Sequence, residues 1–184
     1  MKLAIADPPY LGRAVRWYGA GGCGDGYGKG QADNHPEAHI WDKPETHQEM
    51  VRHLETNYDG WVIALSVHSL STYLEVIKTD SRNGIRVMSW VKPSAVTSGS
   101  RITNTWEPVI VRVPASRKGW NSGERMTDTL ICPPMRSGFV GAKPEAWTHW
   151  VLDAMGYVAG DEVIDLFNGS GAVSKAVNNY AFQA

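Results

Sequence analysis

Two short segments of the sequence carry residue types that could bind and activate a small organic ligand. The first is Asp-Pro-Pro-Tyr at residues 7–10, which directly follows the apolar run Lys2–Ala6. Two consecutive prolines end a strand and leave carbonyl groups without sheet partners. A carboxylate beside such a carbonyl forms a pair of acceptors, which suits a planar amino group with two N–H donors. Tyr10 adds an aromatic face on which a base could stack.

The second segment, Asp-Leu-Phe-Asn-Gly-Ser-Gly at residues 165–171, lies between an expected strand and an expected helix. Its glycines allow a tight turn and a close approach of the backbone to a ligand. Such a turn alone is weak evidence in a chain with 19 glycines. Both segments follow expected strands, however, and open α/β sheets bind ligands beyond the carboxyl ends of their strands. The two segments together are therefore stronger evidence for a site than either alone.

Both segments resemble motifs of the S-adenosylmethionine-dependent amino-methyltransferases, which methylate the exocyclic nitrogen of adenine or cytosine in DNA. In that family Asp-Pro-Pro-Tyr carries catalysis, and Asp-x-Phe-x-Gly-x-Gly binds the cofactor. The order found here, with the catalytic segment first, resembles the permuted β class. Lys143-Pro144 resembles the element that lies over the methionine part of the cofactor in this class. An aspartate before the prolines is commoner in the adenine enzymes than in the cytosine enzymes.

The resemblance implies a set of site residues and S-adenosylmethionine as cofactor, with no metal. The implied catalytic residues are Asp7, Pro8, Pro9 and Tyr10. The implied cofactor-binding residues are Ala6, Asp7, Lys143, Pro144, Asp165, Phe167, Asn168, Gly169, Ser170 and Gly171. Hydrogen bonds to Asp7 and to a carbonyl near Pro8 would localise the lone pair of the target nitrogen and stabilise its positive charge during transfer. The base must leave a duplex to reach such a site.

The middle of the chain is basic and offers candidate contacts to DNA. Residues 80–143 carry ten Lys/Arg and four Asp/Glu, a balance of +6, between segments with balances of −3 and −4. This gradient fits a phosphate-binding face or an ordinary solvated surface. Residues 114–143 form a candidate short target-recognition loop. The expected nucleic-acid contacts are Arg13, Arg16, Arg117, Lys118, Trp120 and Arg125.

Alternating strand and helix patterns predict an α/β fold with a mostly parallel sheet, which the resemblance makes a Rossmann-like methyltransferase fold in one domain, residues 1–184. The expected strands are Lys2–Ala6, Trp61–Leu65, Ile85–Val91, Trp106–Val113 and Glu162–Phe167. The first expected helix begins at a cap at Asp42 or Lys43 and is closed by Gly60, and the second begins at a cap at Ser69. A third helix is expected from Glu145 to a cap at Gly156, and a fourth over Ala172–Asn179. Residues 114–143 are expected to be irregular.

Two further segments bear on the resemblance, the glycine-rich residues 19–30 and the C-terminal residues 180–184. Seven of the twelve residues 19–30 are glycine, which fits a flexible loop or a lid over base and cofactor. The lid is favoured because this segment directly follows Asp7–Tyr10. In the family, a further strand ends in an acid that holds the cofactor ribose, whereas Tyr180–Ala184 contains no acid. We therefore expect a sheet shortened at its C-terminal end, and either a weaker affinity for the cofactor or a different group on the ribose.

Composition limits the alternatives. With 184 residues, 42% of them hydrophobic, and no apolar run of about 18 residues, the chain is expected to be cytoplasmic and without a membrane partner. The compact form of the enzyme that the resemblance implies suggests a bacterial or phage-infected cell. Two cysteines cannot form a disulfide framework. His35 and His39 have helical spacing but no obvious third metal ligand.

The sequence thus predicts methyl transfer to an amino group of a nucleobase, with adenine N6 in DNA favoured. The alternatives are methylation of RNA adenine or of cytosine N4 on the same scaffold, and methylation of a small molecule or protein amide. Another is an inactive methyltransferase fold that serves as a nucleic-acid-binding or regulatory subunit. A homodimer or a partner subunit for target recognition is also open. Cofactor binding separates the enzyme from the inactive fold.

Overall fold

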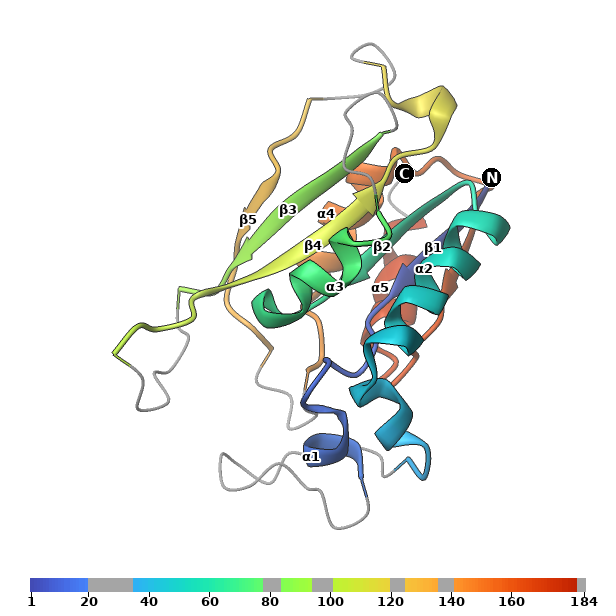
Figure 1. Cartoon of the computed structure of the whole chain (residues 1–184). Helices are drawn as coiled ribbons and strands as arrows, with labels where there is room; N and C mark the ends of the chain where they lie inside the picture. Colours follow the sequence, from blue (N-terminus) through green and yellow to red (C-terminus); the bar gives the residue numbers. More distant parts are fainter. Residues whose placement is uncertain (20–34, 78–83, 94–100, 120–124, 136–140, 182–184) are drawn as a thin grey trace.

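The computed structural model describes residues 1–19, 35–77, 84–93, 101–119, 125–135 and 141–181. These residues form one six-stranded sheet with helices on both of its faces (Figure 1). The strands follow the order β5-β3-β4-β2-β1-β6. Their bounds are β1 Lys2–Ala6, β2 Gly60–Ala64, β3 Ile85–Val91, β4 Trp106–Arg112, β5 Thr129–Ile131 and β6 Glu162–Asp165.

Five of the six strands run in the same direction. Strand β1 is parallel to β2 and β6, and β3 is parallel to β5, whereas β4 is antiparallel to both of its neighbours, β2 and β3. The sheet is therefore mostly parallel, as predicted. Because β4 runs the other way, its first residues lie at the edge where the other five strands end.

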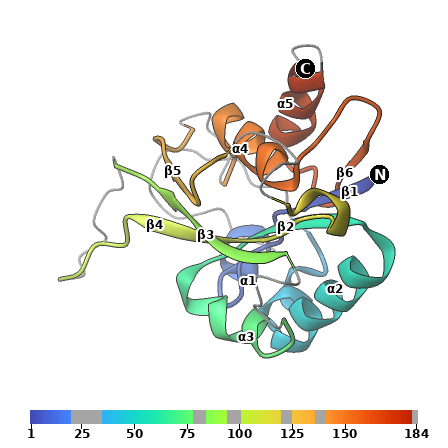
Figure 2. The ribbon, with the colours of Figure 1, turned by 90° about the horizontal axis from the view of Figure 1, so that it is seen from above.

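The helices cover the two faces of the sheet in pairs (Figure 2). α2 (Pro44–Asn57) and α3 (Leu70–Leu74) lie on one face, and α4 (Glu145–Met155) and α5 (Ala172–Ala181) on the other. α1 (Ala14–Tyr18) lies beyond the carboxyl ends of the parallel strands (Figure 1). No helix in the described part of the chain is long and apolar enough to cross a membrane.

Strand β1 is buried on both faces, which explains its uninterrupted apolar sequence. Leu3 and Ile5 pack in the core under α4, which includes Trp147. Ala4 and Ala6 pack in the opposite core, under α2. The alternation follows from the two-residue period of a strand, and both cores hold the end of β1 rigidly in place.

The helix ends differ from the sequence-based expectations. α2 begins at Pro44, whose missing N–H costs nothing there, and neither Asp42 nor Lys43 caps it through a side chain. Gly60 does not close α2, which ends at Asn57; Gly60 instead begins β2. The prediction of Gly156 as the left-handed cap of α4 is confirmed by its φ of 66°.

Three further elements correct the expected pattern. Ser69 does not cap α3 through its side chain, because its hydroxyl donates to the carbonyl of Ser66. Residues 114–143 are not wholly irregular, since β5 lies within them and pairs with β3. The five-residue 3-10 segment Ala38–Asp42 (η1) precedes α2 and was not expected. The proposed lid at residues 19–30 falls, after Gly19, outside the described residues.

Candidate active site

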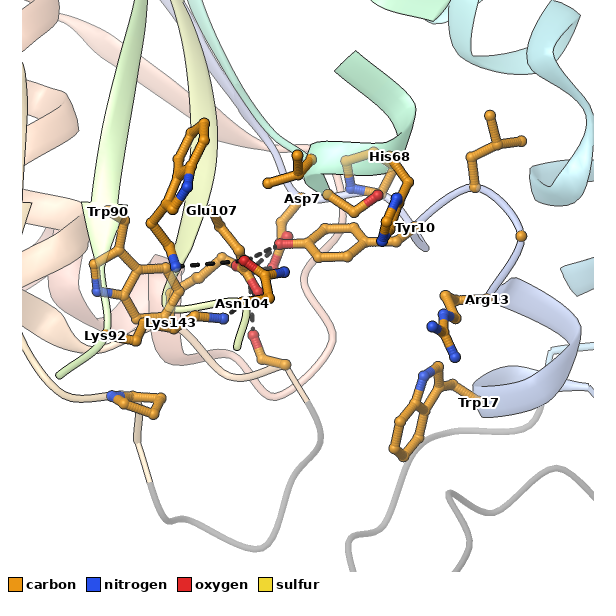
Figure 3. Close-up of a pocket in the computed structure, with 18 of the residues that line it drawn as sticks. Asp7, Tyr10, Arg13, Trp17, His68, Trp90, Lys92, Asn104, Glu107 and Lys143 are labelled. Carbon is orange, nitrogen blue, oxygen red and sulfur yellow. Dashed lines mark hydrogen bonds and ion pairs between the residues drawn. The ribbon is translucent and has the colours of Figure 1, made fainter. Parts of the chain in front are cut away.

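The site lies where the chain leaves five parallel strands and enters β4. Asp7 follows β1, Lys92 follows β3, and the glycine turn follows β6, while Glu107 is the second residue of β4. Segments far apart in sequence therefore meet at one edge of the sheet (Figure 3). This is the edge at which open α/β sheets bind ligands, so the two predicted segments do come together.

Asp7 forms a buried ion pair with Lys143. The Lys143 Nζ atom lies 2.7 Å from each carboxylate oxygen of Asp7 and 3.3 Å from the carbonyl oxygen of Gly141. The Lys143 side chain is 3% exposed and that of Asp7 is 19% exposed. Burial raises the pKa of Asp7, and the positive charge of Lys143 opposes that rise. The pair is thus held inside the protein, where its charges depend on each other.

Three aromatic rings surround the ammonium group of Lys143. The Nζ atom lies 5.6 Å from the ring centre of Tyr10, 5.9 Å from that of Trp90 and 5.7 Å from that of Trp147. Aromatic faces attract cations at such distances, so this corner of the protein favours a positively charged nitrogen.

Tyr10 is fixed by a second polar network. Its hydroxyl donates to a carboxylate oxygen of Glu107 at 2.8 Å, and Glu107 also pairs with Lys92 (Figure 3). Burial and the nearby charge of Glu107 raise the pKa of Tyr10, which keeps the phenol protonated as the donor. The ring of Tyr10 is therefore held as a wall of the site, with its orientation set from β4.

Two pockets meet at Asp7. The first has a volume of about 1140 Å³ and the second about 530 Å³. Both pockets are lined by Asp7, Tyr18 and Gly141–Lys143. The first pocket is rich in aromatic and polar side chains, among them Tyr10, Trp17, His68, Trp90, Asn104 and Trp106. The second is lined by the glycine turn, by η1 and by the residues just before η1. Its lining includes His35, Glu37, Trp41, Phe167, Asn168 and Ser170.

The glycine turn is shaped by Asp165. One of its oxygens accepts from the backbone N–H of Phe167 at 3.2 Å, and the other accepts from the Ser174 hydroxyl at 3.1 Å. Gly169 and Gly171 have φ angles of 35° and 74°, which side chains with a Cβ rarely adopt. Asp165 does not line either pocket, so its contribution is to hold the turn in shape.

Trp41 of η1 lines the second pocket next to the glycine-turn segment. Its ring packs edge-on against Phe167, with ring centres 5.0 Å apart. The fully buried His47 holds this segment, because its Nε2 lies 2.7 Å from the Trp41 carbonyl oxygen. A carbonyl only accepts, so Nε2 carries the proton and Nδ1 accepts from the Tyr73 hydroxyl at 2.7 Å. Burial lowers the pKa of His47, which keeps the ring neutral.

The side chain of Asp42, which was one of two candidates to cap α2, instead links η1 to α1. The Asp42 carboxylate accepts from the backbone N–H groups of Ala14 and Val15 at 2.9 and 3.0 Å. Asp42 therefore satisfies donors in the first turn of α1 and not of α2. The contact fixes the helix that presents Trp17 and Tyr18 to the pockets.

Some of the implied cofactor residues do not line the pockets. Ala6 is fully buried in β1, and Pro144 is the residue from which α4 starts. Neither residue, nor Gly171, lines either pocket. The other implied cofactor residues, Asp165 aside, are all on the wall of the second pocket.

The expected nucleic-acid contacts are divided between the two ends of the sheet. Arg13 lines the first pocket, and Arg16 lies on α1, its guanidinium 5.9 Å from the ring centre of Trp17. Arg117 instead pairs with Asp161 at the opposite edge, where Asp161 also binds the N-terminal amino group. Lys118 lies beside Gly84 at that same edge, and Arg125 precedes β5. Trp120 lies outside the described residues.

Several site residues were missed by the sequence reasoning. Trp90 lies on β3, Lys92 follows β3, and Glu107 lies on β4, and the sequence predicted both strands only as apolar runs. The available signal was a single glutamate before Pro108. Glu37 and Trp41 precede the first expected helix and have no motif around them. In the part of the chain that the structure describes, no three His, Cys, Asp or Glu side chains cluster as metal ligands.

Comparison with known proteins identifies the fold. No family model and no curated protein matches the sequence. Among solved structures, the M1.HpyAVI–SAM complex matches with a TM-score of 0.60 and 16% identity, covering 98% of this chain and 78% of that chain. M1.HpyAVI alone matches with a TM-score of 0.57 and 15% identity, over 98% and 76% of the two chains. This chain has a Rossmann-like methyltransferase fold.

Proposed function

We propose that this protein transfers a methyl group from S-adenosylmethionine to the exocyclic amino group of a nucleobase in DNA, with adenine N6 as the target. The observation that carries the proposal is the position of Asp7 at the junction of two pockets. One pocket has the glycine turn expected for the cofactor, and the other has aromatic walls that suit a base. The M1.HpyAVI–SAM complex, which has the same fold, supports S-adenosylmethionine as the cofactor.

The second pocket is the proposed cofactor site. Its volume of about 530 Å³ lies within the usual range for sites that enclose a small ligand. The glycine turn allows close approach, and Trp41 and Phe167 offer apolar surface to the adenine ring. Among the described lining residues, Glu37 is the carboxylate besides Asp7, and its side chain has no hydrogen-bond or ion-pair partner there. We assign Glu37 to the ribose hydroxyls.

The first pocket is the proposed base site, and Asp7 is the catalytic group. The amino nitrogen would donate to Asp7 and to the Pro8 carbonyl, which receives no hydrogen bond from any described residue. As the methyl–sulfur bond breaks and the nitrogen–methyl bond forms, the nitrogen becomes positive and then releases one proton to water. The carboxylate and the aromatic rings of Tyr10 and Trp90 would stabilise that charge.

The test uses S-adenosylmethionine with a labelled methyl group and unmethylated DNA. Wild-type protein is compared with Asp7→Asn, and the DNA is digested to nucleosides. Labelled N6-methyladenine from the wild type, lost in the variant, is expected. Labelled N4-methylcytosine would keep the mechanism but overturn the assignment to adenine, and label only in a parallel RNA sample would overturn DNA as the substrate. No label in any sample, with no cofactor binding by calorimetry, would leave a binding module.

A further inference from the structure

The ammonium group of Lys143 occupies a fully satisfied site on Asp7. A lysine ammonium has three N–H donors. The two Asp7 oxygens and the Gly141 carbonyl lie within hydrogen-bonding reach of Nζ, at 2.7, 2.7 and 3.3 Å. The Lys143 side chain is 3% exposed, so the ammonium group is almost wholly shielded from water. This is a built cation site, with the rings of Tyr10, Trp90 and Trp147 around it.

A target amino group needs the same acceptor. Both Asp7 oxygens are engaged by Lys143 from one direction, and a neutral amino group is a weaker hydrogen-bond partner for a carboxylate than an ammonium group is. Resting on the function proposed above, we infer that Lys143 is a positioning residue that competes with the target amino group for Asp7, and that the cofactor's own carboxylate draws Lys143 away.

The position of Lys143 explains why a carboxylate in the second pocket would have this effect. Lys143 lines both pockets, and its four-carbon stem allows the ammonium to move while its backbone stays in place. Removing a buried ammonium from its anionic partner Asp7 is costly. A second carboxylate, that of the methionine part of S-adenosylmethionine, gives Lys143 a new partner and so lowers this cost. Cofactor binding would then precede and permit the seating of the base.

The inference is tested without catalysis by following the Asp7 carboxyl carbon by NMR as a function of pH. Two ligands are compared: S-adenosylhomocysteine, which has the amino-acid carboxylate, and 5′-methylthioadenosine, which lacks it. Loss of its positive neighbour should raise the pKa of Asp7, by about one unit or more with S-adenosylhomocysteine relative to 5′-methylthioadenosine. The other charged groups that act on Asp7, Glu107 and Asp165, and the neighbouring Tyr10, Tyr18 and Tyr73, are the same in both samples.

Two effects could change the pKa of Asp7 when the ligand binds: movement of Lys143, and the charge of the ligand itself. The variant Lys143→Met separates them, because it removes the first and keeps the second. In this variant the difference between the two ligands should shrink, whereas Lys2→Met, which removes an exposed lysine at the opposite edge, should keep it. Equal pKa values with both ligands in the wild type, or an unchanged difference in Lys143→Met, would overturn the inference. The wild-type comparison stands even if Lys143→Met does not fold, and Lys143→Gln then replaces it.

A kinetic measurement gives a second, independent readout. Decarboxylated S-adenosylmethionine carries the same transferable methyl group without the carboxylate. At saturating cofactor, wild-type kcat should be lower with the decarboxylated form by about fivefold or more, and Lys143→Met should remove this difference. A residue that only binds the cofactor would change KM and leave the kcat ratio at one. Failure of S-adenosylhomocysteine to bind would contradict the proposed function itself, whereas methyl transfer with equal kcat values contradicts only the inference.

Discussion

At the scale of single residues, the site combines two ion pairs, Asp7–Lys143 and Glu107–Lys92, with aromatic groups that they hold in place. Asp7 and Lys143 form the first pair, while Tyr10 is held by Glu107 and so presents its ring in one orientation. The separate attachment of Tyr10 to β4 means that its hydroxyl and its ring contribute differently. Substitutions that remove one and keep the other should therefore have different effects.

Tyr10→Phe removes the hydrogen bond to Glu107 and keeps the ring. Because this is a hydrogen bond to a carboxylate, we expect a loss of unfolding free energy of about 1.5–3 kcal/mol. Glu107 retains its ion pair with Lys92, so the change in kcat should be small. Tyr10→Ala also removes the stacking face, worth about 1–3 kcal/mol for a base, so kcat/KM should fall further. Steady-state methylation of DNA measures both variants, and equal losses in the two would contradict a stacking role.

Glu37→Gln tests the assignment of the ribose hydroxyls. A hydrogen bond to a charged group contributes about 1.5–3 kcal/mol, so the dissociation constant for S-adenosylhomocysteine should rise about tenfold to a hundredfold. Calorimetry provides the measurement. Glu45→Gln, which changes an exposed acid in the first turn of α2, is the matched control and should leave affinity unchanged. Equal affinities for Glu37→Gln and the wild type would show that another group holds the ribose.

At the scale of elements, the short segment η1 is the least expected part of the site and is held by α2. His47 on α2 bonds the Trp41 carbonyl, and Trp41 in turn packs against Phe167. Asp42, at the end of η1, holds the first turn of α1. A helix, a 3-10 segment and a second helix are thus linked in series around the second pocket.

The buried, neutral His47 makes stability depend on pH. Its folded-state pKa is lowered by burial, so below the unfolded-state value of about 6.5 the unfolded chain binds a proton that the folded chain does not. The contribution is complete above that pH and is lost as pH falls, by up to about 1.4 kcal/mol per pH unit. Denaturant unfolding at pH 7.5 and 5.5 should show a larger drop for the wild type than for His47→Gln. Identical drops would contradict this origin.

At the scale of the whole molecule, the basic residues of the sequence divide between two opposite edges of the sheet. Arg13 lies at the edge with the pockets, whereas Arg117 is paired with Asp161 beside the N-terminus. The pair lowers the pKa of Asp161, as expected for a carboxylate held by a cation. Among the described basic residues of 80–143, Lys92 and Lys143 lie at the edge with the pockets, whereas Arg117 and Lys118 lie at the opposite edge, so these four charges do not form one continuous face.

Arg13→Ala and Arg117→Ala should have opposite consequences. The first should weaken binding to DNA and reduce by about one the slope of log affinity against log salt, with little change in stability. The second should lower the unfolding free energy by about 3 kcal/mol, because it leaves the buried Asp161 without its main partner, and should leave DNA affinity unchanged. Fluorescence anisotropy over a salt series and denaturant unfolding provide the two measurements. A reduced salt slope in Arg117→Ala would place DNA at the far edge as well.

The sequence by itself determined what depends on a few neighbouring residues. The apolar runs of β1 to β4, the left-handed cap at Gly156 and the two segments that follow β1 and β6 were all predictable, because strand periodicity and turn chemistry act over a few residues. β5 was missed because three residues paired with one neighbour carry no such pattern.

Only the tertiary structure decided which side chains meet. Lys143 reaches Asp7 across 136 residues of sequence, and Tyr10 reaches Glu107 across 97. The Tyr10–Glu107 contact follows from the strand order, in which the antiparallel β4 brings its first residues to the carboxyl edge of the other five strands. Local sequence patterns do not encode that order, since it is set by how the whole sheet and its two layers of helices bury their apolar faces together.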